Sequence, residues 1–174
     1  YGGGLLHIKP GPQFEIFKQN KLDATVGDPT SYRVAGLAFD TDNNLWISNF
    51  GAAQPLRVMK ADGSWKSFTI PFTLFQNALS QIVIDNKNYK WMVSPMGNGL
   101  VCYDHGVSIE NIADDRWRKF GAGSVNGNLP SNDVLCISKD KNGFVWVGTS
   151  DGIGVFQCTE LVFAAQGCDA VWPV

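Results

Sequence analysis

The chain has 174 residues, of which 44% are hydrophobic and 17% are charged, an ordinary composition for a globular protein with a substantial core. Its 14 basic and 16 acidic residues give a net charge of −2 without any basic cluster, which gives no footprint for nucleic acid or an anionic membrane. No run approaches the roughly eighteen consecutive apolar residues that indicate a transmembrane helix.

Short apolar segments run along the chain from its beginning. They are four to seven residues long, are rich in Val, Ile, Leu, Trp and Phe, and are separated by Asp/Asn/Gly clusters at 41–44, 86–88 and 141–143. No stretch has a sustained helical period. The sequence therefore predicts an all-β protein. Segments 34–39 and 82–84 are apolar at successive positions, which predicts inner strands that are covered on both faces.

These strand candidates recur in a fixed order. Three times an aspartate is followed six residues later by a tryptophan, at Asp40/Trp46, Asp85/Trp91 and Asp140/Trp146. Apolar residues stand six and three positions before each aspartate, a third apolar segment follows each tryptophan, and a fourth segment with two aromatics follows in the complete copies. The opening segment 4–8 aligns with 99–103, which is the third segment of a copy. Such a repeat indicates small units that bury each other's faces.

Four strand candidates per copy predict the blades of a β-propeller. The copies are 45 residues long from Val34 to Leu79 and 55 residues long from Leu79 to Val134, which suits a blade. A strand-plus-helix solenoid would be shorter, and an immunoglobulin-like sandwich would not repeat its sequence. We expect one all-β propeller segment of about four four-stranded antiparallel blades, part of a larger propeller, with a partial blade at 1–33, blades at 34–78 and 79–133, and a partial blade at 134–174.

The repeated residues have structural interpretations. The three tryptophans are expected to be buried wedges between blades rather than ligand-stacking residues. Each aspartate is expected to accept backbone amides in the turn between the first two strands. The oxygen-rich segment 40–44 resembles a calcium loop but lacks the glycine and the distal glutamate of an EF-hand. With two histidines and no Cys-x-x-Cys pair, the sequence predicts no metal site and no cofactor.

Two of the four cysteines lie in a polar segment, and the other two lie in apolar segments. Cys158 and Cys168 lie in a polar stretch and are candidates for a loop-closing disulfide, although these residues alone leave open whether they stay reduced. Cys102 and Cys136 lie in apolar strand segments and are expected to be buried as small hydrophobic residues.

The last copy also carries a family resemblance. Residues 129–134 read Leu-Pro-Ser-Asn-Asp-Val, and residues 140–152 read Asp-Lys-Asn-Gly-Phe-Val-Trp-Val-Gly-Thr-Ser-Asp-Gly. This closely resembles the repeat of the two-component regulator propellers, common in Bacteroidetes, which is L-P-S-N-x-V followed by D-x-x-G-x-x-W-x-G-T-x-x-G. The earlier copies depart from that pattern at Asn43, Ser48, Asn88 and Ser94, where it has glycines. The resemblance spans about residues 1–158 and explains blade-building residues.

The resemblance implies an exported bacterial protein, either periplasmic or at the cell surface. Proteins of this family serve as periplasmic sensors of hybrid two-component systems, often for oligosaccharides, or as secreted propellers such as the one in the type IX secretion attachment complex. The tail with Cys158 and Cys168 looks more like the secretion-associated branch, and export favours a disulfide between them. Because the family closes larger rings, we expect the chain to come from a longer polypeptide and to pair with the remainder of its own propeller.

In a propeller, the loops between second and third strands lie with the connections between blades on one face. Such loops hold functional residues on a rigid scaffold. Their amides, hydroxyls and exposed apolar groups suit a protein partner or an oligosaccharide or peptide ligand, although ordinary polar loops are the alternative. The candidate ligand-binding residues are Asn49, Phe50, Gln54, Met96, Asn98, Thr149, Ser150 and Asp151.

A catalytic function is the alternative hypothesis. The streptogramin lyases are propellers with a similar repeat, and they need a histidine base. By alignment, His105 lies in a turn on the other face and His7 lies in a strand. The chain has no G-x-S-x-G elbow, and Gly97-x-Gly99 lacks the third glycine of a nucleotide loop. The sequence therefore favours a non-enzymatic binding or assembly module.

Overall fold

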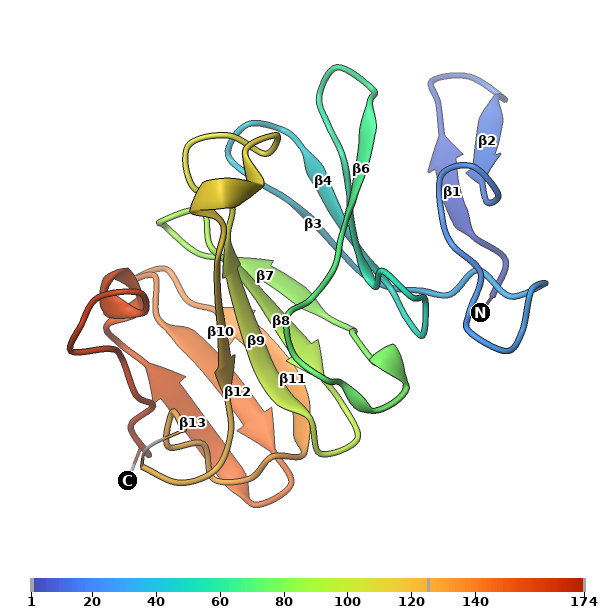
Figure 1. Cartoon of the computed structure of the whole chain (residues 1–174). Helices are drawn as coiled ribbons and strands as arrows, with labels where there is room; N and C mark the ends of the chain where they lie inside the picture. The colour runs from blue at the N-terminus through green and yellow to red at the C-terminus, as the bar shows by residue number, and fades with distance from the viewer. Residues whose placement is uncertain (1, 125, 174) are drawn as a thin grey trace. The chain divides into compact units, whose positions relative to one another are not determined.

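The computed structural model describes residues 2–124 and 126–173. Residues 1, 125 and 174 lie outside this part, and with them one position of each of the expected blades 1–33, 79–133 and 134–174. Along the chain, the described residues divide into two compact units, one up to Ser80 and one from Gln81 onward. Figure 1 shows the strands of each unit. No helix of the described residues is long and apolar enough to cross a membrane.

Unit 1, up to Ser80, contains two antiparallel sheets. The first has two strands, β1 (Leu5–Ile8) and β2 (Phe14–Phe17). The second has four strands that pair in chain order: β3 (Val34–Phe39), β4 (Leu45–Asn49), β5 (Leu56–Met59) and β6 (Trp65–Phe68). A short 3-10 helix, η1 (Phe75–Asn77), follows. One cluster of buried residues in the unit joins the two sheets and contains Leu5, Leu22, Tyr32, Leu45 and Ile47.

Unit 2, from Gln81 onward, also contains two antiparallel sheets. Its four-stranded sheet contains β7 (Ile82–Ile84), β8 (Lys90–Ser94), β9 (Gly99–Asp104) and β10 (Arg116–Phe120), and its three-stranded sheet contains β11 (Val134–Lys139), β12 (Val145–Thr149) and β13 (Gly152–Phe156). A 3-10 helix, η2 (Ile112–Asp114), lies between β9 and β10, and another, η3 (Thr159–Leu161), follows β13. The sequential antiparallel order of all four sheets is the order predicted for blades.

Aromatic rings connect the two sheets of unit 2. The indole of Trp91 on β8 is stacked on Phe120 of its own sheet, with ring centroids 5.4 Å apart. It also contacts Phe156 of the next sheet at 4.9 Å. All three side chains are fully buried. Trp91 is therefore the wedge between sheets that its place in the repeat predicts.

The spacing of six residues between aspartate and tryptophan has a chemical cause. One carboxylate oxygen of Asp85 accepts the backbone amides of Lys87 at 2.8 Å and Tyr89 at 2.9 Å. The other accepts the indole N–H of Trp91 at 2.8 Å. The same set of bonds, with indole distances of 2.8 and 3.0 Å, recurs in the pairs Asp40/Trp46 and Asp140/Trp146. Asp and Trp therefore recur together because one carboxylate closes the turn and holds the indole.

This turn also explains why the glycine of the family pattern can be replaced. The third residue after each aspartate has a positive φ, 61° at Asn43, 64° at Asn88 and 90° at Gly143. Asparagine tolerates this left-handed conformation better than other non-glycine residues do. The first two copies therefore build the same turn as the last copy.

The structure corrects several burial expectations. Trp46 and Trp91 are fully buried, but Trp146 is 38% exposed, because unit 2 has no further sheet among its described residues to cover it. Cys136, which lies opposite Gly148 in the pairing of β11 with β12, is exposed rather than buried. On β3, Leu37 and Phe39 are 48% and 64% exposed, so this strand is not covered on both faces.

We expect Trp91→Ala to lower the free energy of unfolding by about 3–5 kcal/mol, because it removes a buried aromatic side chain. Trp146→Ala removes the same indole bond from a partly exposed site and should cost about half as much or less. Chemical denaturation of both variants tests this. Equal losses would contradict the assignment of Trp91 as the buried wedge.

The matched aspartates should titrate differently. Burial raises the pKa of Asp85 above its ordinary 3.8, more than the bonds from Trp91 and Tyr89 lower it. Burial acts on Asp40 too, but the bonds from Trp46 and Asn44 together outweigh it and lower the pKa. Asp40 therefore adds stability that is present above its unfolded pKa and is lost as the pH falls through the lower folded value.

For Asp85 the sign is opposite. Its contribution is complete below the unfolded pKa and is lost as the pH rises through the raised folded pKa. Carboxyl ¹³C shifts followed by NMR should place the two midpoints on opposite sides of 3.8. Coincident midpoints would refute this difference in environment.

Candidate functional site

Each unit has a pocket beside the loop that joins the second and third strands of its four-stranded sheet, which is the β4–β5 loop in unit 1 and the β8–β9 loop in unit 2. Connections between sheets form the rest of each pocket. In unit 1 this pocket has a volume of about 530 Å³. The lining combines an aromatic ring, amides, a hydroxyl and an ion pair: Thr25, Val26, Gly27, Asp28, Arg33, Phe50, Gly51, Gln76 and Asn77. We refer to it as the unit 1 pocket.

Backbone hydrogen bonds fix three separate segments around the unit 1 pocket. The amide of Phe50 donates to the carbonyl of Arg33 at 2.8 Å, and the amide of Val26 donates to Gly51 at 2.8 Å. The amide of Gly51 in turn donates to Asn77 at 3.2 Å. Gly51 has a φ of 76°, and a Cβ there would lie 2.9 Å from a methyl carbon of Thr25. The loop after β4 therefore needs glycine at this position.

One side of the unit 1 pocket has a strained backbone. Gln76 and Asn77 in η1 have φ values of 56° and 47°. Glutamine in particular rarely adopts this conformation, which costs about 1–3 kcal/mol when the surrounding structure enforces it. The buried side chain of Leu74 anchors the segment, and its carbonyl accepts the amide of Asn77 at 3.0 Å. Strain of this kind clusters at ligand-binding sites.

Unit 2 has an equivalent but smaller pocket of about 290 Å³. It is lined by Gly97, Asn98, Lys119, Phe120, Gly121, Ala122, Asn126 and Asn132. The amide group of Asn98 donates to the carbonyl of Pro95 at 2.7 Å, and the side-chain oxygen of Asn132 accepts the amide of Ala122 at 2.7 Å. Two of the asparagines that line this pocket therefore already hold the loops in place.

In unit 1, the structure separates the three residues predicted to bind a ligand. Phe50 lines the unit 1 pocket, but it is buried rather than exposed as the sequence predicted. Asn49 is buried beside it, where its side chain accepts the amide of Asp23 at 2.8 Å and donates to the carbonyl of Arg33 at 3.3 Å. Gln54 lies outside the lining and bonds to Thr69 and Ser67. Asn49 thus positions the loop rather than facing the pocket.

In unit 2, the five predicted residues are also dispersed. Asn98 lines the smaller pocket, whereas the neighbouring Met96 is half exposed and has a positive φ of 63°. Thr149 donates to the carbonyl of Gly152 at 2.9 Å and accepts the amide of Asp151. Ser150 bonds to the hydroxyl of Ser131 at 2.9 Å. These last contacts stabilise the tight turn between β12 and β13.

Sequence reasoning missed one side of the unit 1 pocket. Thr25, Asp28 and Arg33 come from the connection between β2 and β3, whereas Gln76 and Asn77 of η1 belong to the connection 70–78, one of the connections between blades that the sequence places on the binding face. The first connection follows an incomplete copy, so no repeat register marked it. The signal that was available is the turn sequence Gly27-Asp28-Pro29, which separates strand candidates.

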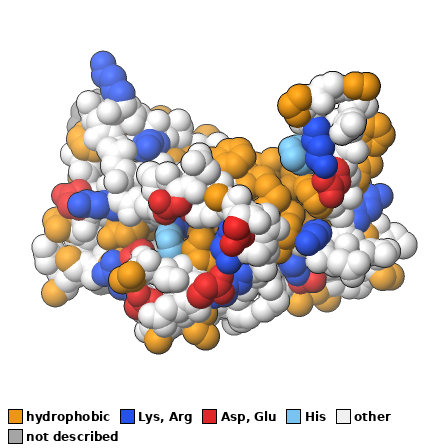
Figure 2. All heavy atoms as spheres, turned by 90° about the horizontal axis from the view of Figure 1, so that it is seen from above, with side chains coloured by type: hydrophobic (Ala, Val, Ile, Leu, Met, Phe, Trp, Pro, Cys, Tyr) orange, Lys and Arg blue, Asp and Glu red, His pale blue; other side chains and the backbone are white. Residues whose placement is uncertain are grey.

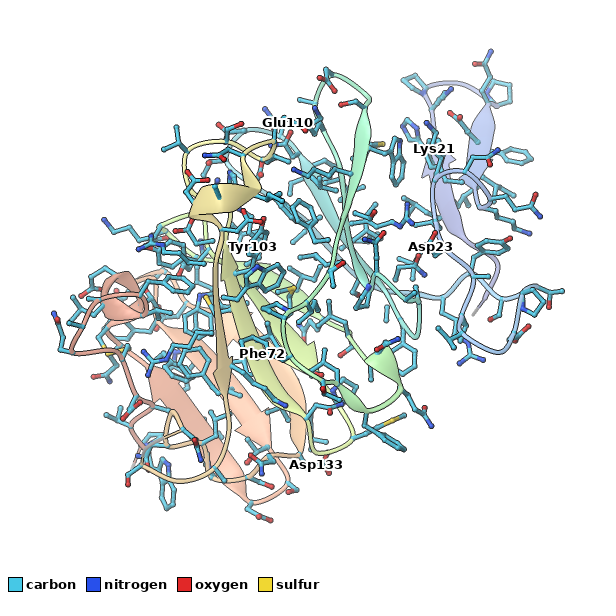
Figure 3. The ribbon with its side chains drawn as sticks, in the orientation of Figure 1. Lys21, Asp23, Phe72, Tyr103, Glu110 and Asp133 are labelled. Atoms are coloured by element: carbon cyan, nitrogen blue, oxygen red, sulfur yellow. A yellow bond between two sulfur atoms is a disulfide. The ribbon has the colours of Figure 1, made fainter. Side chains whose placement is uncertain are left out.

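The opposite end of unit 2 contains a cluster of charged residues. Figure 3 labels Asp133 at the connection end and Glu110 in the loop between β9 and β10 at the other end. Near that loop, Asp104 forms an ion pair with Arg116 and accepts the amide of Gly106, while Asp114 accepts the amide of Val107. These carboxylates fix a turn. No group of three potential ligand side chains in the described residues could hold a metal ion.

Neither histidine belongs to a loop pocket. His105 is buried after β9, with Nδ1 2.6 Å from Nζ of the buried Lys90. His7 is exposed on β1. Among the described residues, neither the unit 1 pocket nor its counterpart in unit 2 has a histidine in its lining.

The tail after β13 folds back on unit 2. A disulfide joins Cys158 and Cys168, whose Cα atoms lie 5.6 Å apart. Cys168 belongs to the core of the unit, and Val171 exchanges two backbone bonds of 2.9 Å with Val155 on β13. The tail therefore covers part of the free edge of the last strand. Cys102 has a free, buried thiol, and its burial raises its pKa.

We expect thiol counting on the unfolded, unreduced chain to find two free groups, from Cys102 and Cys136. Reduction should lower the stability of the chain by about 2–3 kcal/mol, since the disulfide closes a short loop. Cys158→Ser should reproduce this loss, and Cys136→Ser, at an exposed site, should not. Four free thiols, or no effect of reduction, would contradict the role of the disulfide.

Known proteins resemble this chain in sequence over a short stretch and in structure over nearly all of it. The sequence model of the two-component regulator propeller family matches residues 128–151. No curated protein sequence matches the chain. PorZ, a bacterial surface component of the type IX secretion system of Porphyromonas gingivalis, is 21% identical with a TM-score of 0.82, over 99% of this chain and 24% of PorZ.

Two other solved structures match this chain with lower TM-scores. The extracellular domain of a hybrid two-component system from B. thetaiotaomicron is 25% identical with a TM-score of 0.53, over 80% of this chain and 17% of that one. Virginiamycin B lyase from Staphylococcus aureus, solved in an inactive form with quinupristin, is 12% identical with a TM-score of 0.65, over 91% of this chain and 46% of the lyase.

These similarities confirm the fold class predicted from the repeat. The chain is an all-β segment of propeller type, and residues 2–124 and 126–173 form four antiparallel sheets of two to four strands. It spans about a quarter of the length of PorZ. The family match falls on the last copy of the repeat, where the sequence resembles the pattern of the two-component regulator propellers most closely.

Proposed function

We propose that this chain is a non-enzymatic binding or assembly module of an exported bacterial protein, and that it binds through the unit 1 pocket. The observation that carries this proposal is the composition of that pocket. It places an aromatic ring, two side-chain amides and an ion pair around one hollow, on a backbone that is strained at Gln76 and Asn77. In this module, residues 34–78 and 79–133 each form a complete propeller blade.

The chemistry of the unit 1 pocket suits a neutral polar ligand. Phe50 provides an apolar wall, while Gln76, Asn77 and Thr25 provide donors and acceptors. Nη2 of Arg33 lies 3.8 Å from Oδ2 of Asp28, so the two side chains form an ion pair and add no net charge to the pocket. Such sites combine apolar surface with a few polar groups that fix orientation. An oligosaccharide or an extended peptide segment matches these requirements.

Two biological roles are compatible with such a module. The likeness to PorZ supports a role in cell-surface assembly, and the likeness to the extracellular domain of a hybrid two-component system supports periplasmic ligand sensing. The cysteine-bearing tail, which resembles the secretion-associated branch, favours assembly. Both roles imply an exported protein, in the periplasm or at the cell surface.

A lyase of the streptogramin type is the second candidate, favoured by the structural likeness to virginiamycin B lyase. Such an enzyme needs a histidine base close to its substrate. His105 is instead buried beside Lys90, near the charged turn of unit 2. The non-enzymatic function therefore fits these residues better.

The test uses Gln76→Gly, which removes an exposed side chain from the unit 1 pocket and relieves the positive φ at that position. We expect unchanged or slightly higher stability and a loss of binding of about fivefold or more. Asp42→Asn, an exposed substitution in the turn between β3 and β4, is the matched control and should bind normally.

The probes are an oligosaccharide array and a pull-down from periplasmic and surface extracts, each repeated with both variants. An oligosaccharide that loses binding on Gln76→Gly favours sensing, and secretion-system proteins lost in the same way favour assembly. If the chain binds neither probe, or if Gln76→Gly binds as the wild type does, the unit 1 pocket is not the binding site.

A further inference from the structure

The beginning of unit 1 and the middle of unit 2 are built in the same way. Gly4 before β1 and Gly99 in β9 have φ values of 92° and 90°. The amide of Gly4 donates to the carbonyl of Tyr32, and the amide of Gly99 donates to the carbonyl of Asn132, each at 3.0 Å. A Cβ at either glycine would lie too close to a backbone carbonyl of the next strand, at 2.3 and 2.1 Å. The strands β1, β2 and β3 therefore correspond to β9, β10 and β11.

In unit 2, β8 covers one edge of β9 and part of the face of β11. It pairs with the edge of β9 that β10 does not occupy, with Trp91 opposite Cys102. It also lies, together with β7, against β11 of the next sheet. There Ile137 is only 2% exposed, and its amide donates to the side chain of Gln81 at 3.0 Å.

In unit 1 the corresponding strands are absent from the described residues. Among the strands that the structure describes, β1 pairs with β2 alone, which leaves its other edge open over Leu5–Ile8 (Figure 1). Leu37, which like Ile137 stands three residues before the repeat aspartate, is 48% exposed, and Phe39 is 64% exposed. An open strand edge and a neighbouring apolar face thus occur where β7 and β8 lie in unit 2.

Apolar side chains reach the surface in this part of the chain. Figure 2 shows hydrophobic atoms on the right of the view, where β1 and β2 lie. An open edge beside exposed apolar groups is a template for pairing with another strand. The edge supplies backbone bonds, and the apolar face selects the side chains of the incoming strand.

We propose that the edge of β1 and the face of β3 bind a β-hairpin of the same repeat, which carries the aspartate–tryptophan pair. The hairpin pairs with β1 as β8 pairs with β9, which places its tryptophan opposite His7. Its indole lies on Phe17, as the rings of Trp46 and Trp91 lie 5.4 Å from Phe68 and Phe120. Its other strand covers Leu37. This surface is separate from the unit 1 pocket, so the inference does not rest on the proposed function.

The test uses the full chain and a synthetic hairpin with the sequence of residues 79–98, which includes Asp85 and Trp91. A disulfide between added terminal cysteines holds the peptide as a hairpin, since an isolated two-stranded hairpin is marginally stable. We expect saturable binding by fluorescence anisotropy, and slower amide hydrogen exchange over Leu5–Ile8. The same peptide with Trp91→Ala should bind about tenfold more weakly or worse.

Leu37→Glu in the chain should weaken binding by about tenfold or more, because it places a carboxylate in an apolar contact. Val107→Glu makes a similar change at a side chain that is 94% exposed in unit 2 and should leave binding unchanged. Lack of saturable binding would overturn the proposal. So would binding that Leu37→Glu does not weaken, binding without exchange protection at β1, or self-association of the chain through β1 that excludes the peptide.

Discussion

The carboxylate of the repeat aspartate is the interaction on which each complete sheet depends. Its two oxygens close the turn between the first two strands and hold the indole of the second strand, as in the Asp85–Trp91 bond of 2.8 Å. The indole is thereby fixed in orientation, and its ring can pack between sheets. A charged acceptor strengthens such bonds, and it must be retained because a buried indole N–H without a partner would be costly. Turn, wedge and sheet stacking are therefore linked through one side chain.

Much of the fold could be predicted from the sequence because the repeat combines several independent signals. The spacing from Asp85 to Trp91, the apolar segments and the turn residues all agree on sequential four-stranded units, and the structure has strands at those places. Burial was harder to predict, because it depends on neighbours that a repeat pattern does not describe. Trp146 has the same local bonds as Trp91 but lacks a covering sheet in unit 2, and Leu37 has the same place in the repeat as Ile137 but is exposed.

The candidate site was less predictable for a similar reason. The rule that loops on one face carry function selected Phe50 and Asn98, which do line pockets. It could not distinguish them from Asn49, whose amide is used to fix the loop. The unit 1 pocket is completed by Arg33 and Gln76, which come from connections outside the repeated pattern. Polar loop residues that bind their own backbone and those that face a ligand have the same composition, and only their hydrogen bonds separate them.

A double-mutant cycle between Asp85→Asn and Trp91→Phe tests the central interaction most directly. Asparagine offers one acceptor oxygen, so it cannot serve both the turn amides and the indole, while phenylalanine removes the indole N–H and keeps an aromatic ring. Denaturation of the two single variants and the double variant measures their coupling. The account predicts a coupling free energy of about 1–3 kcal/mol, typical of a buried bond to a charged group. Additive effects of the two substitutions would contradict it, because turn and wedge would then be independent.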